Sequence, residues 1–88
     1  MSYVEPNTKY VPLWIFLTSE RRQRLTLHFD EIEAILGFTL PRSARRYQAW
    51  WSNSSEMGHS HARSWEFAGF ATAGIDLHNE LVDFLKVH

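Results

Sequence analysis

The sequence predicts a small α+β domain that combines short helices with one early strand and a C-terminal β-hairpin. Its 88 residues suffice for a single domain, and aromatic residues, at 15% of the composition, supply bulk for a core of this size. Apolar residues recur at helical spacing in some segments and alternate with polar residues in others. Cysteine is absent. These observations favour a globular chain over a disordered or disulfide-bonded one.

The first helix is predicted in the segment "YVPLWIFLTSE". Residues 1 to 9 before it are polar and are expected to form a flexible lead-in to one domain at residues 10 to 88. Pro12 suits a first helical turn, and apolar residues follow it on one helical face. These residues are Leu13, Phe16 and Leu17. A strand through "LWIFL" is the alternative.

A strand and a second helix are predicted next. Leu25, Leu27 and Phe29 alternate with polar residues, which is typical of a half-buried strand. The segment "DEIEAILG" predicts a two-turn helix, because its acidic first turn complements the helix dipole and Gly37 can form its left-handed C-terminal cap. The apolar stripe of this helix is Ile32, Ile35 and Leu36.

The segment "LPRSARRYQAWWSN", residues 40 to 53, crowds arginines and large aromatic side chains together. Pro41 ends the preceding element, and Ser43 is expected to cap a helix that begins at Ala44. The side chains predicted to share the buried face are Ala44, Tyr47 and Trp51. Trp50 is then the better candidate for a partly exposed ring. The arginines predicted to face outward are Arg42, Arg45 and Arg46.

A loop and a third main helix follow. Composition predicts a loop at residues 52 to 60, and Ser60 is a plausible N-cap for a helix that Gly69 ends. Ala62 and Trp65 are expected to point inward from this helix. The histidines and serines around its start would lie beside free backbone N–H groups, which is a natural anion site.

A β-hairpin is predicted at the end of the chain, from "ATAGIDL", the turn "HNE" and "LVDFLKV". The apolar alternation in its first strand is Ala71, Ala73, Ile75 and Leu77. The second strand offers Val82, Phe84 and Leu85 for burial. The predicted order, α-β-α-α-α-β-β, resembles the winged helix-turn-helix fold, in which helix 3 is presented to DNA and a terminal hairpin forms the wing.

Several motifs span most of the chain: "FDEIEAILG", "LPRSAR", "WWSN" and "HSHARSW". Through them the sequence resembles a family of small bacterial and phage domains of unknown function. His61 and Phe70 depart from that family's pattern, which has Gln and Trp there. The resemblance implies no established activity. The polar motif residues to which it draws attention are Ser43, Arg45, Asn53 and His59.

The leading functional hypothesis is a DNA-binding module that is not an enzyme. Arginine binds phosphate in bidentate fashion, and aromatic rings can stack on exposed bases. The predicted contacts come from the basic, aromatic segment and from the start of the third main helix. They are Arg42, Ser43, Arg45, Arg46, Trp50, Asn53, His59, Ser60, His61 and Arg63.

A protein-interaction module is the alternative, for example a phage-encoded inhibitor of a bacterial defence or regulatory protein. A net charge of −1 gives no general attraction to nucleic acid. Tyr, Trp and Arg also dominate the energetically important positions of protein interfaces. A homodimer is compatible with either hypothesis.

Other functional classes have little support. His59 and His61 form an H-x-H pair, but no spacing selects the further ligands that a zinc site needs. The sequence carries none of the common catalytic or phosphate-binding motifs, so no enzyme activity and no cofactor are expected. No apolar run approaches the length of a membrane span, and the N-terminus is unlike a signal peptide. A cytoplasmic protein is therefore expected.

Overall fold

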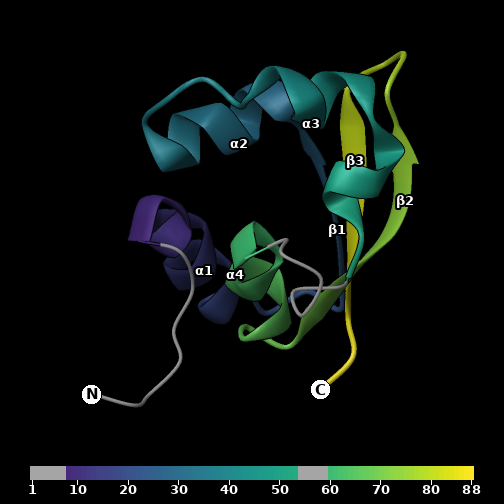
Figure 1. The fold of residues 1–88 in the computed structure, drawn as a ribbon. Helices are drawn as coiled ribbons and strands as arrows, with labels where there is room; N and C mark the ends of the chain where they lie inside the picture. The colour runs from purple at the N-terminus through teal and green to yellow at the C-terminus, as the bar shows by residue number, and fades with distance from the viewer. Residues whose placement is uncertain (1–7, 54–59) are drawn as a thin grey trace.

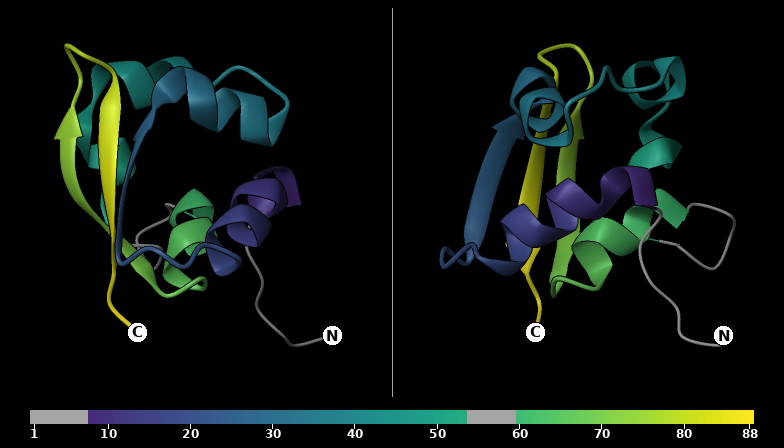
Figure 2. Two further views of the ribbon diagram at one scale, coloured as in Figure 1. Left: turned by 180° about the vertical axis from the view of Figure 1, so that it is seen from behind. Right: turned by 90° about the vertical axis from the view of Figure 1, so that its left-hand side faces the viewer.

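Four α-helices and a three-stranded antiparallel sheet form the part of the chain that the computed structural model describes, residues 8–53 and 60–88. The helices lie on one side of the sheet in two groups. Helices α2 (Phe29–Leu36) and α3 (Arg42–Arg46) cover one end, and α1 (Val11–Thr18) and α4 (Arg63–Glu66) cover the other (Figure 1). Views from behind and from the side show the same two groups (Figure 2). The predicted α+β class and order of elements are confirmed.

The first helix is confirmed and the alternative strand is not: α1 is helical throughout, with Pro12 in its first turn. Leu13 and Leu17 are buried, as the helical spacing predicted. The helix is nevertheless apolar on nearly every side, and Ile15 is 59% exposed. In the described ranges, no helix is long and apolar enough to cross a membrane. Of the predicted lead-in, only Thr8 and Lys9 lie within the described residues, and they belong to the 3-10 turn η1 (Thr8–Tyr10).

The sheet has the strand order β1-β3-β2, with β1 at Arg24–His28, β2 at Phe70–Asp76 and β3 at Leu81–Lys86. Leu25 pairs with Phe84 and Leu27 with Val82, which places these four side chains on the face that the helices cover. The predicted first strand is thus confirmed, except that Phe29 already begins α2.

Helix α2 agrees closely with its prediction. The Glu31 carboxylate accepts a hydrogen bond from the His28 N–H (2.8 Å) at the start of the helix, and Gly37 ends it with φ of 84°. Ile32 and Leu36 are buried against the core.

Helix α3 differs from its prediction. It begins at Arg42 directly after Pro41, so Ser43 lies inside the first turn and makes no capping hydrogen bond. It also ends early, because the backbone of Tyr47 is extended (φ −125°, ψ 121°). A 3-10 turn, η2 (Gln48–Trp51), follows this break. Ala44 and Trp51 are buried as predicted, but Tyr47 is 59% exposed, so its assignment to the core was wrong.

The third main helix is shorter than predicted. A 3-10 turn, η4 (Ser60–Ala62), leads into α4, and Ala62 rather than Ser60 occupies the N-cap position. Ala62 and Trp65 are buried, as expected. Gly69, with φ of 88°, separates the helix from β2. Most of the predicted loop before Ser60 lies outside the described residues.

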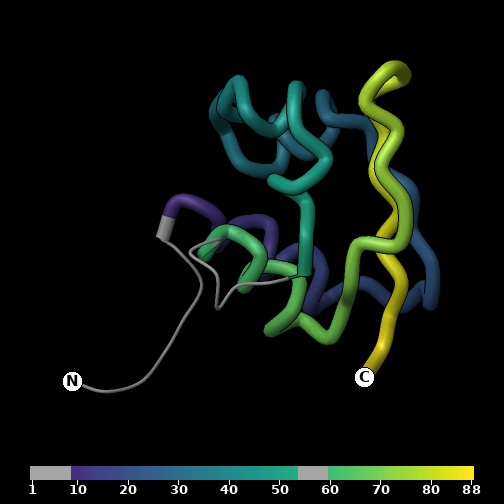
Figure 3. The backbone as a smooth tube through the Cα atoms, turned by 45° about the vertical axis from the view of Figure 1, so that its right-hand side comes forward, coloured from purple at the N-terminus to yellow at the C-terminus, as the bar shows by residue number. Residues whose placement is uncertain are grey.

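The predicted hairpin is confirmed, and Ile75, Leu77, Val82 and Phe84 pack in or against the core as expected. The predicted burial of Ala71, Ala73 and Leu85 was wrong. Phe70 and Thr72 face the helices, whereas Ala71 lies opposite Leu85 on the other face, where Leu85 is 40% exposed. The ladder has a bulge between Thr72 and Gly74. An extra residue in one strand reverses the alternation, so Ile75 faces the core again. The tube view shows the bend of this strand (Figure 3).

Candidate nucleic-acid interface

The basic, aromatic segment is divided between core and surface. Trp51 is fully buried, and its indole N–H donates to the Ala44 carbonyl (2.8 Å). Its ring stacks on Phe29, with the ring centroids 5.1 Å apart. The second tryptophan of the pair therefore fastens η2 to α3 and α2, and it takes no part in a surface site.

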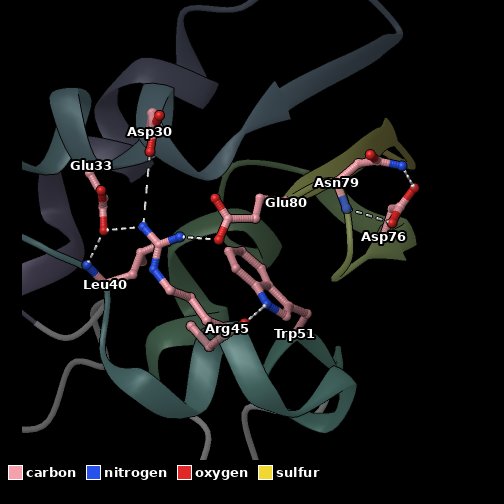
Figure 4. Close-up of polar contacts among 9 residues, drawn as sticks. Asp30, Glu33, Leu40, Arg45, Trp51, Asp76, Asn79 and Glu80 are labelled. Atoms are coloured by element: carbon pink, nitrogen blue, oxygen red, sulfur yellow. Dashed lines mark hydrogen bonds and ion pairs between the residues drawn. The ribbon is translucent and has the colours of Figure 1, made fainter.

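Arg45 does not face outward, contrary to the prediction. Its guanidinium contacts Glu33 of α2 at 2.7 Å and Glu80 of the β2–β3 turn at 2.6 Å, with Asp30 at 4.0 Å (Figure 4). The Glu33 carboxylate also accepts the Leu40 N–H at 2.7 Å. This cluster ties α3 to α2 and to the end of the hairpin. Arg45 is 28% exposed, and its charge is already balanced within the chain.

Glu80 holds an uncommon backbone conformation within that cluster. Its φ is +57°, in the left-handed region that non-glycine residues seldom occupy. The Glu80 carbonyl accepts the Phe29 N–H at 2.9 Å while its carboxylate binds Arg45. The turn is therefore fixed to the start of α2 and to α3, which places the hairpin end beside α3.

Asn53 is also used within the chain. Its side-chain oxygen accepts the Trp65 indole N–H and the Thr72 backbone N–H, both at 2.9 Å. Its amide group donates to the Thr72 carbonyl at 3.1 Å. One side chain thus bonds both backbone groups of Thr72, as a neighbouring strand would. Asn53 is exposed, so its contact with a partner stays a prediction, but its amide group is already bonded within the chain.

The start of α4 is packed and does not protrude. The His61 ring stacks on Trp50 (centroids 3.8 Å apart, planes at 7°), and its Nε2 lies 2.6 Å from the Trp50 carbonyl oxygen. Ser64 is fully buried and donates to the His61 carbonyl at 2.8 Å. Ser60 and Arg63 are half-buried, and His59 lies outside the described residues. Trp50 is half-buried, in agreement with the expectation of a partly exposed ring.

The arginines of the two predicted parts of the site lie apart, although the stacking of His61 on Trp50 joins the two parts. Arg63 belongs to the α4 end of the molecule, whereas Arg42 and Arg46 belong to the α3 end (Figure 1). The arginines and large aromatic side chains that remain exposed in the basic, aromatic segment form a group that we call the α3 surface. It consists of Arg42, Arg46 and Tyr47.

Among the described residues, no acidic side chain balances the positive charge of the α3 surface. Arg42 and Arg46 lie one helical turn apart, on the side of α3 away from the buried Ala44. Within the described residues neither guanidinium forms an ion pair or a hydrogen bond. His78 and Asn79, in the turn that Glu80 fixes beside α3, are also exposed. The described ranges contain no cluster of three or more histidine or acidic side chains that could hold a metal ion.

Fold and site together define a small α+β domain in which α3 and the end of a β-hairpin are held side by side, with two arginines and a tyrosine exposed on α3. The chain belongs to the family described as Domain of unknown function (DUF7662), whose model matches residues 10–87. Comparison with curated proteins and with solved structures gives no match.

Proposed function

We propose that this domain binds nucleic acid through the α3 surface and the adjoining hairpin turn, in a winged-helix-like arrangement. The short strand β1 precedes α2, α3 follows after a short connection, and the β2–β3 hairpin takes the place of a wing. In this proposal α3 contacts the nucleic acid, in place of the helix predicted at residues 60 to 69.

The proposal rests on one observation: of three neighbouring arginines, one is paired with carboxylates and two are exposed without an ion pair among the described residues. Arg45 is tied to Glu33 and Glu80 and sets the position of α3. Arg42 and Arg46 are exposed on the same helix and have no such partner among the described residues. Two guanidinium groups one turn apart suit adjacent phosphates, because each can donate two parallel hydrogen bonds.

The dependence of binding on salt tests this proposal. With two phosphate contacts, log K against log salt is expected to have a slope of about −2 between about 50 and 200 mM salt. The double variant Arg42→Gln/Arg46→Gln should bind more weakly and lose about two units of that slope. Fluorescence anisotropy with labelled oligonucleotides measures both quantities.

A matched variant separates a local contact from overall charge. Arg21→Gln/Arg63→Gln removes the same charge from the other end of the molecule and is expected to leave the slope nearly unchanged. Equal weakening by the two double variants would show that charge acts without a defined site, and the α3 surface would then not be the interface.

Helix α1 supports a second candidate function, binding of another protein. Its outer side carries Ile15, 59% exposed, beside a shallow depression of about 240 Å³. The described residues that line this depression are Trp14, Ile15, Thr18 and Ser19. A helix that is apolar on all sides is ordinarily covered on all sides.

Ile15→Glu tests this second candidate. Since Ile15 is exposed, the free energy of unfolding should change by no more than about 0.5 kcal/mol. If α1 binds a protein, a pull-down with the unchanged chain should recover one stoichiometric partner that the Ile15→Glu chain fails to recover. Recovery of the same partner by both chains would exclude α1 as its binding site.

A further inference from the structure

We propose that Tyr47 is a base-stacking residue that gives the α3 surface a preference for nucleic acid with an unpaired base. This inference rests on the proposed nucleic-acid function and adds the class of ligand. It begins from the exposure of the ring. Among the aromatic side chains of the described residues, only Tyr47 (59%) and Phe67 (45%) are classed as exposed, and only Tyr47 lies beside the free arginines of α3.

The position of Tyr47 is fixed although its ring is exposed. Its backbone N–H donates to the Ser43 carbonyl (2.9 Å), and its own carbonyl accepts the Trp50 N–H (3.1 Å). The residues on either side are anchored as well, since Ala44 and Trp51 are buried and joined by the indole hydrogen bond. The ring therefore projects from a rigid corner between α3 and η2.

Because the backbone is fixed, binding of a flat partner needs to order only the two side-chain torsions of Tyr47, which costs little conformational entropy. Arg46 precedes it directly, so a phosphate contact and a stacking contact would engage the same short stretch of a nucleic-acid strand. In an intact duplex the faces of the bases are covered by their neighbours, and a surface tyrosine has no face to stack on. Single strands and bulges expose such faces, and aromatic side chains bind them with little regard to sequence.

The test compares three labelled DNA ligands of matched composition: a single strand, a perfect duplex and a duplex with one bulged nucleotide. The unchanged protein is expected to bind the single strand and the bulged duplex roughly tenfold more tightly than the perfect duplex. Tyr47→Phe keeps the ring and should keep this preference. Tyr47→Leu keeps an apolar side chain without a ring, and its binding of the three ligands should become nearly equal.

A second readout reports stacking directly. With 2-aminopurine at the bulge, the unchanged protein and Tyr47→Phe should alter its fluorescence, whereas Tyr47→Leu should not. Phe67→Leu, at the exposed aromatic position away from α3, is the control and should behave as the unchanged protein. Because Tyr47 is exposed, thermal unfolding of Tyr47→Leu should match that of the unchanged chain.

The outcomes distinguish the inference from the function on which it rests. If the unchanged protein binds all three ligands equally, or if Tyr47→Leu keeps the preference, Tyr47 does not stack, while the salt dependence and the Arg42→Gln/Arg46→Gln effect still support nucleic-acid binding. If the unchanged protein binds none of the ligands at low salt, the proposed function and the inference both fail.

Discussion

Replacing Asn53 with alanine is expected to lower the free energy of unfolding by about 2–4 kcal/mol, because it removes several hydrogen bonds and leaves a buried indole N–H unpaired. The Trp65 ring is fully buried, so its indole N–H loses its partner inside the packed domain even though Asn53 itself is exposed. Thr72 loses partners for its N–H and its carbonyl in the same substitution. Denaturant unfolding followed by tryptophan fluorescence measures the change.

Asn79→Ala is the matched control for this prediction. Asn79 also donates backbone and side-chain hydrogen bonds, but only to Asp76 in the exposed hairpin turn. Its replacement should therefore cost much less than that of Asn53. If Asn53→Ala unfolds at the same denaturant concentration as Asn79→Ala, the Asn53 hydrogen bonds do not hold η2, α4 and β2 together.

Arg45→Met is expected to destabilise the domain by about 2 kcal/mol at neutral pH, because two carboxylates lose their common partner. The Arg45 guanidinium also lies over the Phe29 ring, 5.6 Å from its centroid. Methionine retains much of the apolar stem and lacks only the guanidinium, so the loss reports mainly on charge. Glu33 is the critical group, since its side chain is only 19% exposed. Thermal or denaturant unfolding gives the measurement.

The effect of Arg45→Met should also depend on pH. Burial acts to raise the pKa of Glu33, but the hydrogen bonds from Arg45 and from the Leu40 N–H outweigh it, and the pKa lies below its ordinary value. A lowered carboxyl pKa contributes stability above the pKa of the unfolded chain, about 4.3, and this contribution is lost as the pH falls through the folded pKa. The difference in the free energy of unfolding between the unchanged chain and Arg45→Met should therefore become smaller as the pH falls from about 7 to about 3.

Arg46→Met provides the comparison, since Arg46 is exposed on the same helix and forms no ion pair among the described residues. It removes the same charge without leaving a carboxylate unpaired, so the unfolding midpoint should remain almost unchanged. A midpoint for Arg45→Met equal to that of Arg46→Met, at every pH, would show that the cluster around Arg45 does not stabilise the fold.

The order of helices and strands was predictable because it follows from local spacing. Pro12, Gly37 and the alternation of Leu25 with Leu27 each act within a few residues of their position. The break at Tyr47 had no such signal. No glycine or proline marks it, and Ala44 and Trp51, seven positions apart, also fit one face of a continuous helix.

The candidate site was harder to predict because contacts with residues distant in sequence decide which of its side chains are paired within the chain and which remain exposed. Arg42, Arg45 and Arg46 look alike in the sequence, and only the approach of Glu33 and Glu80 distinguishes Arg45 from its neighbours. Asn53 likewise satisfies Trp65 and Thr72, which local pattern cannot place beside it. Burial of Trp51 was foreseen from its spacing, but stacking of His61 on Trp50 was not.

The strand order β1-β3-β2 has a consequence for how the chain folds. In the described sheet β1 pairs with β3 alone, although more than fifty residues separate Leu27 from Val82. During synthesis Leu25 and Leu27 therefore cannot form these pairs before residues 81–86 leave the ribosome. Helices α1 and α2 can form earlier, from local contacts. Pairing across so long a separation is slow, so we expect closure of the sheet by β3 to be a late step of folding.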